Sequence, residues 1–219
     1  MSIAVYDDLH EFMVPELPGC PPTLIDQALW RAGREFIDRS KVWEETLDAI
    51  DLVADQTEYY LSVAWQSVID AILEVRINTA AGVTAGTDGT RISDSLYWLE
   101  RTDSSSGFKL VLADSETPAE AITDGLVVKV SMVPTFGSHV LPQWLLERYH
   151  EGIVGLAMHD LMSRNPDDSW SNPSRANYYR KRAMNVVGSG RSDRIQKGRA
   201  RPRGLLEDEY EHEGGGFEW

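Results

Sequence analysis

The sequence lacks the features that mark several classes of protein. It has one cysteine, Cys20, so no disulfide can form within the chain. No apolar run approaches the roughly 20 residues that a bilayer span requires, and residues 1–10 lack a basic stretch followed by an apolar one. We therefore expect a soluble protein, neither exported nor inserted in a membrane, that is made in a reducing compartment.

Positive charge is scarce and unevenly distributed. The chain has 21 Lys and Arg against 35 Asp and Glu, a formal net charge of -14, which opposes general affinity for nucleic acid or anionic membrane because both are polyanions. Residues 1–174 hold 11 basic and 28 acidic residues, residues 175–203 hold 10 and 1, and residues 204–219 hold 0 and 6. The chain thus has an acidic body, a basic segment and an acidic tip, each of which pairs only with a complementary surface.

Patterns of catalytic residues are also missing. His150 and His159 stand on one expected helix, about 13 Å apart along its axis, which is too far for both to bind one ion. The i, i+4 histidine spacing of zinc proteases is absent. Ser189 lacks the strand-to-helix turn that activates a nucleophile. We expect no catalytic residue, no cofactor and no metal site, and hence a chain that is not an enzyme.

The pattern of apolar residues predicts an α+β fold. Apolar residues at helical spacing predict three helices, with Thr23 and Asn172 placed to cap the first and third. Between the first and second helices, alternating or short apolar runs predict antiparallel strands, inserted as a block at about 42–134. The expected helices cover about 23–39, 142–163 and 173–187, and the expected strands lie near 43–53, 58–63, 68–77, 96–101, 108–112 and 125–133.

Apolar periodicity stops after Gly190. Residues 191–219 have too little apolar content to bury a core of their own, so we expect a body over 1–190 and an extended C-terminal arm that becomes ordered on a partner. The arm carries Phe217 and Trp219 after three consecutive glycines at 214–216. Anchoring of these aromatics in a partner's pocket is favoured over simple disorder.

Two tryptophans are candidates for a subunit interface, Trp144 and Trp170. Seven tryptophans are many for a chain of 219 residues, and tryptophan is enriched at the energetic centres of interfaces. Trp170 lies in the polar stretch 167–171, outside any apolar stripe. It either contributes to an interface or folds back over the second and third helices as a lid, and the sequence leaves both alternatives open.

Several linear patterns resemble the head-to-tail adaptor (connector) proteins of short-tailed bacteriophages. The likeness covers about residues 6–60 and 141–187, whereas 64–135 and the residues after Gly188 contribute nothing to it. The stretches that carry it are YDDL at 6–9, VPELPGCP at 14–21, the helix at 25–36, WEE at 43–45, TEY at 57–59, LPQWLLERY at 141–149, WSNP at 170–173 and YR at 179–180.

The resemblance implies a structural virion protein of the neck between head and tail, assembled in the host cytoplasm. It implies a homododecameric ring that docks under the portal protein, extends the DNA channel and provides the platform for the tail nozzle protein. Double-stranded DNA would pass through the channel without specific binding, and an acidic body fits that role because it repels phosphate.

The resemblance also implies a portal-binding arm. Its basic residues would pair with acidic portal surface, and Phe217 and Trp219 would lock into a portal groove. The alternative is a DNA-binding protein that uses the basic segment 175–203, since arginine-rich segments bind nucleic acid. The basic residues assigned to the arm are Arg191, Arg194, Lys197, Arg199, Arg201 and Arg203.

Overall fold

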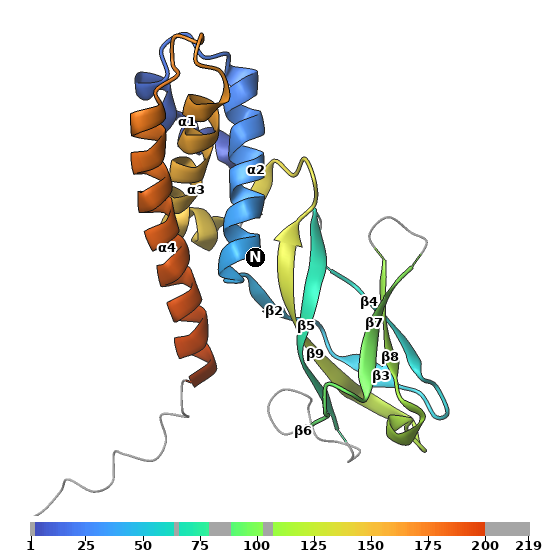
Figure 1. Cartoon of the computed structure of the whole chain (residues 1–219). Coiled ribbons are helices and arrows are strands. Elements are labelled where there is room, and N and C mark those ends of the chain that lie inside the picture. Colours follow the sequence, from blue (N-terminus) through green and yellow to red (C-terminus); the bar gives the residue numbers. More distant parts are fainter. Residues whose placement is uncertain (1–2, 64–65, 79–88, 103–106, 200–219) are drawn as a thin grey trace, which may run out of the picture.

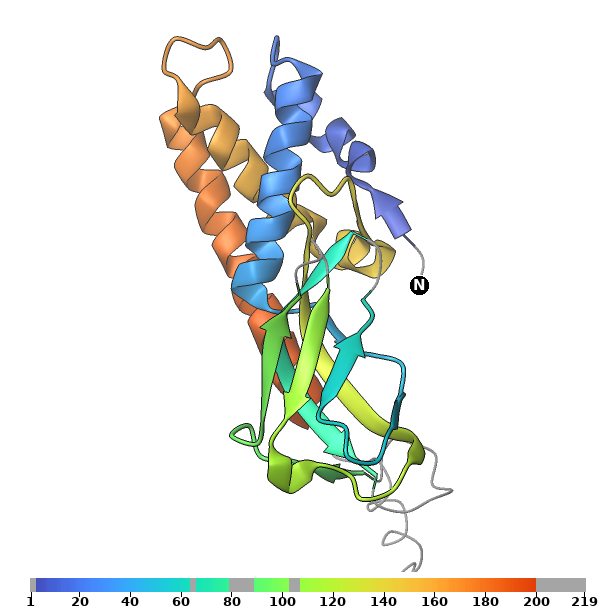
Figure 2. The same ribbon diagram turned by 90° about the vertical axis from the view of Figure 1, so that its right-hand side faces the viewer.

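A helical body and a block of antiparallel strands lie end to end. The computed structural model describes residues 3–63, 66–78, 89–102 and 107–199. Figure 1 shows the helices at one end and the strands at the other, and the same division is visible in the side view of Figure 2. The predicted α+β fold is therefore confirmed.

Three long helices form the body. They are α2 (Pro22–Ser40), α3 (Gln143–Arg164) and α4 (Pro173–Arg199). The central helix α3 packs against both α2 and α4. Close approach requires glycine at two positions of α3, because a Cβ at Gly152 would lie 2.6 Å from the ring of Phe36 and one at Gly155 would lie 3.0 Å from the Cβ of Ala183.

The sequence pattern explains why α2 lies where it does. Its predicted apolar stripe, which includes Ile25, Leu29 and Phe36, is buried. The prediction that Thr23 caps this helix is wrong, because the helix begins at Pro22 and the N-cap position is taken by Pro21, with no side-chain cap. Proline suits a first turn, where its missing N–H costs nothing. Asn172 does cap α4, since its Oδ1 accepts the backbone N–H of Arg175 at 3.1 Å.

The strand block contains two antiparallel sheets that share one core. The first sheet has the order β2-β9-β5-β6, with β3 also paired to β9, and the second has the order β4-β8-β7. Inward side chains of both sheets, such as Val75, Val128, Leu110 and Tyr59, belong to the same buried cluster. The strands are β2 (Glu44–Thr46), β3 (Ile50–Leu52), β4 (Glu58–Leu61), β5 (Ser67–Ile77), β6 (Thr90–Arg91), β7 (Tyr97–Arg101), β8 (Phe108–Leu112) and β9 (Ile122–Pro134).

Short elements at the beginning of the chain cover the helical body. They are β1 (Ile3–Val5), η1 (Tyr6–Leu9), α1 (His10–Met13) and η2 (Val14–Glu16), and one further short turn, η3 (Asp114–Glu116), precedes β9. Strand β1 pairs with β10 (Val140–Pro142), and this antiparallel pair ties the beginning of the chain to the start of α3. The sequence pattern did not indicate this pair, because three-residue strands are too short for a detectable alternation.

Two predicted boundaries are wrong. Helix α3 begins at Gln143, so Pro142 is its N-cap residue rather than its first helical residue. Helix α4 continues to Arg199, well past the expected end near 187, so the expected extended arm does not begin at 191. The glycines at 188 and 190 do not stop the helix, because Gly190 is buried with its Cβ position 3.1 Å from the Cβ of Ser40, the last residue of α2. The remainder of the arm, 200–219, lies outside the described residues.

Candidate docking surfaces

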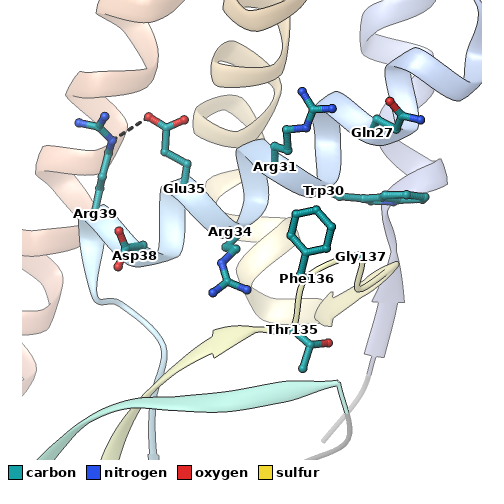
Figure 3. A pocket seen from close by; sticks show the side chains of 10 residues that line it. All are labelled: Gln27, Trp30, Arg31, Arg34, Glu35, Asp38, Arg39, Thr135, Phe136 and Gly137. Atoms are coloured by element: carbon teal, nitrogen blue, oxygen red, sulfur yellow. Dashed lines mark ion pairs between the residues drawn. The ribbon is translucent and has the colours of Figure 1, made fainter. Parts of the chain in front are cut away.

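A groove of about 640 Å³ lies between the exposed face of α2 and the loop that joins β9 to β10. We call it the α2 groove. Figure 3 shows Trp30 and Phe136 at one end of it and the Glu35–Arg39 pair at the other. Aromatic and arginine side chains are enriched at protein–protein interfaces, so the α2 groove is a candidate docking surface.

Phe136 is the most exposed aromatic side chain of the described structure, at 88%. Its loop is held in place, because the backbone N–H of Thr135 donates to the carbonyl of Gln66 at 2.9 Å and the hydroxyl of Ser138 donates to the side-chain oxygen of Gln66 at 3.0 Å. Gly137 adopts φ 77°, a conformation that favours glycine. The exposure of Phe136 is therefore fixed by a well-bonded turn.

The aromatic end of the α2 groove is built on Trp30. This ring is partly buried and meets the ring of His139 edge to face, with centroids 4.0 Å apart. Arg34, one turn further along α2, donates to the carbonyl oxygen of Pro134 at 2.9 Å. The helix and the loop are thus joined beneath the groove, while its aromatic rim stays accessible.

Charged side chains of both signs line the α2 face of the groove. The guanidinium of Arg39 pairs with Glu35 at 2.7 Å, and that of Arg31 lies 3.8 Å from Asp160. Within the part of the chain that the structure describes, no carboxylate lies within ion-pair distance of Arg34. The groove therefore presents three arginines and only two lining acids, Glu35 and Asp38.

A second set of contacts holds the last part of α4 against the body. Arg191 Nε donates to the carbonyl oxygen of Arg39 at 2.7 Å, and Arg194 Nε donates to Glu44 at 2.7 Å. Asp193 accepts hydrogen bonds from Tyr149 at 2.8 Å and pairs with Arg148 at 2.9 Å. We call Arg191, Asp193 and Arg194 the polar clasp. It joins α4 to α2, α3 and β2.

Burial and charge shift two pKa values at the polar clasp. Burial alone raises the pKa of Glu44, but hydrogen bonds and charges from Lys129 and Arg194 outweigh that effect and hold the pKa below its usual value. Lys129 lies 2.6 Å from this carboxylate. Burial, followed by the hydrogen bond to Asp193, raises the pKa of Tyr149 to about 12. Glu44 is therefore ionised, and Tyr149 protonated, throughout the neutral range.

The residues predicted for the arm separate into three groups. Arg191 and Arg194 belong to the polar clasp, so both already have contacts within the chain. Lys197 and Arg199 lie on the last turns of α4. Arg201, Arg203, Phe217 and Trp219 lie outside the described residues.

The two candidate interface tryptophans are both partly buried. Trp144 lies on the first turn of α3, with its ring centroid 6.5 Å from that of Tyr149. Trp170 lies in the connection between α3 and α4 and packs against the buried core, as the lid alternative expects. A role for either residue between subunits stays a prediction.

The most exposed aromatic side chains of the described structure were not identified from the sequence. Besides Phe136 they include Tyr60 on β4, 72% exposed, and Trp98 on β7, 47% exposed. Trp98 is aligned with Val111 on β8 and Tyr60 with Lys109, so both aromatics lie on the outer face of the second sheet. A detectable signal for Phe136 was its position in a Thr-Phe-Gly turn directly after a predicted strand.

One group of residues in the described structure has the donor set for a metal ion. Ligand atoms of Asp7, His10 and Asp26 lie within 4.8 Å of one another. His10 Nε2 is 2.7 Å from Asp26 Oδ1, so a hydrogen bond between α1 and α2 accounts for the closeness of these two residues. The expectation that the protein holds no metal stays a prediction.

Two further findings concern the reactivity of Cys20 and the apolarity of the helices. Burial raises the pKa of the Cys20 thiol, which makes it a weaker nucleophile at neutral pH. Among the helices that the structure describes, none combines the length and apolarity needed to cross a membrane.

Comparisons with protein-family models and with curated proteins found no match to this chain.

Proposed function

We propose that the chain is a structural virion protein, a head-to-tail adaptor that forms a dodecameric ring under the portal protein, extends the DNA channel and provides the platform for the tail nozzle. The observation that carries the proposal is a basic helix that projects from an acidic body. Gly190 lies against Ser40 at the end of α2, so the nine residues from there to Arg199 carry α4 about 13 Å further. Figure 1 shows this projection.

The projecting helix suits contact with a portal. The polar clasp fixes the direction of α4 through Arg191 and Arg194, and Lys197 and Arg199 belong to the last turns of the same helix. Arg201 and Arg203 follow them in the sequence. A helix whose attachment to the body is already fixed loses less conformational entropy on binding than a flexible segment does. We propose that these cations and the aromatics Phe217 and Trp219 bind the portal.

The outer face of the second sheet suits contact between neighbouring subunits. Exposed aromatics are enriched at interfaces, and Tyr60 and Trp98 both lie on this face. Subunits of a closed ring meet through two different surfaces, so a face of this kind requires a different complementary surface on the next copy. Trp144 and Trp170 remain candidates for that second surface.

The alternative, DNA binding through 175–203, has less support. Arg175 pairs with Glu16, and Arg182 pairs with Glu151 at 3.0 Å. Together with Arg191 and Arg194, four of the basic side chains of this segment thus have partners within the chain. Non-specific affinity for DNA comes from the counterions that are released when protein cations neutralise phosphates. A segment with fewer unpaired cations is therefore expected to bind DNA more weakly.

Electron microscopy of the chain mixed with its portal protein tests the proposal. A twelve-fold ring on the portal is the expected result, and its absence at saturating concentrations would contradict the proposed function. The contribution of the arm is tested by deleting 204–219. We expect weaker capture on immobilised portal, with an unchanged circular dichroism spectrum.

A salt series of duplex-DNA binding decides between the two candidates. Affinity that falls steeply with salt, and that disappears when 191–203 are deleted, would favour the DNA-binding alternative. Weak binding that does not respond to the deletion is the result expected of an adaptor.

A further inference from the structure

We infer that the α2 groove is the binding site for segment 204–219 of the same chain. This inference concerns the free protein and stands whether or not the chain is an adaptor. Three observations point to this occupant: the charge of the groove, its aromatic rim, and the position of residues 191–195 of α4 beside it.

The charges of the groove and of the segment are complementary. Segment 204–219 has six acidic residues and no Lys or Arg. The groove offers Arg34, whose hydrogen bond goes to a carbonyl oxygen rather than to a carboxylate. It also offers Arg31, which is 55% exposed and lies 3.8 Å from its acidic neighbour Asp160. A carboxylate that approached either guanidinium could form a charge-assisted hydrogen bond.

The aromatic residues of the segment match the rim of the groove. Trp30 presents the accessible part of its ring, and Phe136 is held out on a well-bonded turn. Rings of Phe217 and Trp219 placed on this rim would bury apolar surface that is otherwise in water. In the sequence, three glycines at 214–216 separate most of the acidic residues from the two aromatics, so the two parts can meet different side chains of the groove.

The polar clasp holds residues 191–195 of α4 beside the Arg39 end of the α2 groove. Arg191, Arg194 and Ile195 line a hollow together with Asp38 and Arg39, and those last two residues also line the α2 groove. The groove runs along α2 from Arg39 to Gln27, about 18 Å of helix. Residues 200–219, when extended, reach up to about 66 Å, so they can return to the groove from the end of α4.

Segment 204–219 of the same chain is favoured as the occupant over the same segment of a second copy of the protein, because it is covalently attached to the body. Attachment through a segment of this length gives a local concentration on the order of millimolar, far above that of a neighbouring chain in dilute solution. Any external partner that binds the same aromatics, such as the portal of the proposed function, must then compete with the α2 groove.

Photocrosslinking of the full chain tests the inference. Phe217 is replaced by p-benzoylphenylalanine, the chain is irradiated at low concentration, and the adducts are mapped by mass spectrometry. The sample mixes isotope-labelled and unlabelled chains, so that adducts within one chain are distinguished from adducts between chains. We expect adducts within one chain, on α2 residues 27–39 or on loop residues 135–137.

A matched pair of second substitutions tests the specificity of the adducts. Phe136→Ala should reduce the yield of groove adducts several-fold, whereas Tyr60→Ala, on the second sheet, should leave it unchanged. Both side chains are largely exposed, so neither change should alter the thermal melting temperature. High salt should also reduce the yield, because the recognition is partly ionic.

Three outcomes would overturn the inference. They are adducts spread over the body without preference for the groove, adducts that join labelled to unlabelled chains, and a yield that Phe136→Ala and Tyr60→Ala change equally.

Discussion

The two parts of α4 are held to the body by different forces. The first part packs through small apolar side chains, and Ala176, Ala183 and Val187 are at most 1% exposed. The last part is held by the polar clasp, apart from the close contact of Gly190 with Ser40. One continuous helix thus changes its mode of attachment at about Gly190.

This difference predicts unequal stability along the helix. Burial of apolar surface responds little to pH, whereas ion pairs depend on the ionisation of both partners. Local opening also occurs most easily where few apolar side chains are buried. We therefore expect the last part of α4 to open without the first part.

The largest effect is expected from a substitution at the apolar attachment. In Gly152→Val, new side-chain atoms would overlap the buried ring of Phe36, and overpacking of this kind costs about 3 kcal/mol of unfolding free energy. Chemical denaturation of the full chain measures it. The matched control is Gly188→Val, because a Cβ there meets nothing within 4 Å, and it should change stability by less than about 0.5 kcal/mol. Equal effects of the two substitutions would contradict the packing of α3.

An intermediate and local effect is expected at the polar clasp. Glu44→Gln removes the negative charge that Arg194 and Lys129 share. Loss of a partly buried charged hydrogen bond costs about 2 kcal/mol. Hydrogen exchange should accelerate at amides 190–196 and stay unchanged at 176–187. The control is Glu35→Gln, which breaks an exposed pair worth at most about 1 kcal/mol.

Low pH should have the same local effect as Glu44→Gln. The pKa of Glu44 is lower in the folded protein than in the unfolded chain, so the carboxylate stabilises the fold above its unfolded pKa. That contribution is lost as the pH falls through the folded pKa. Protection factors at amides 190–196, which correct for the slower intrinsic exchange in acid, should therefore fall at low pH in the unchanged protein. In Glu44→Gln this fall should be smaller, and an equal fall in both proteins would contradict the assignment to Glu44.

The smallest effect is expected at Tyr149. Its pKa of about 12 lies above the usual value of 10.0, so its contribution to stability is complete below pH 10 and is lost as the pH rises to about 12. Tyr149→Phe should cost about 1 kcal/mol, the value of one hydrogen bond. The difference between the tyrosinate absorbance titrations of the two proteins isolates this group. A midpoint near 10 in that difference would contradict both the burial of this hydroxyl and its hydrogen bond to Asp193.

The sequence was a good guide wherever a local pattern reported directly on burial. The stripe of α2 and the alternation of β4 and β8 placed these elements to within a few residues, because one face of each is covered by the core. Asn172 was identified as a cap because its side chain serves a backbone N–H only three residues away. These interactions span few residues and leave a local trace in the sequence.

The candidate docking surfaces were not predictable in the same way. Trp30 and Phe136 approach each other only because the loop after β9 returns to α2, and no periodic pattern connects them. The exposure of Phe136 depends on the hydrogen bonds that Gln66 makes with its loop, from a point roughly 70 residues earlier in the chain. An exposed aromatic cannot be distinguished from a buried one by composition alone.

The sequence by itself determined the α+β architecture and the division of charge into an acidic body, a basic segment and an acidic tip. Only the tertiary structure decided where the basic segment leaves the body. The loss of apolar periodicity after Gly190 indicated the end of a helix, but contacts such as Arg194 with Glu44 connect residues 150 positions apart and hold α4 against the body beyond that point. Helix propensity is a local and weak quantity, and packing against distant residues overrides it.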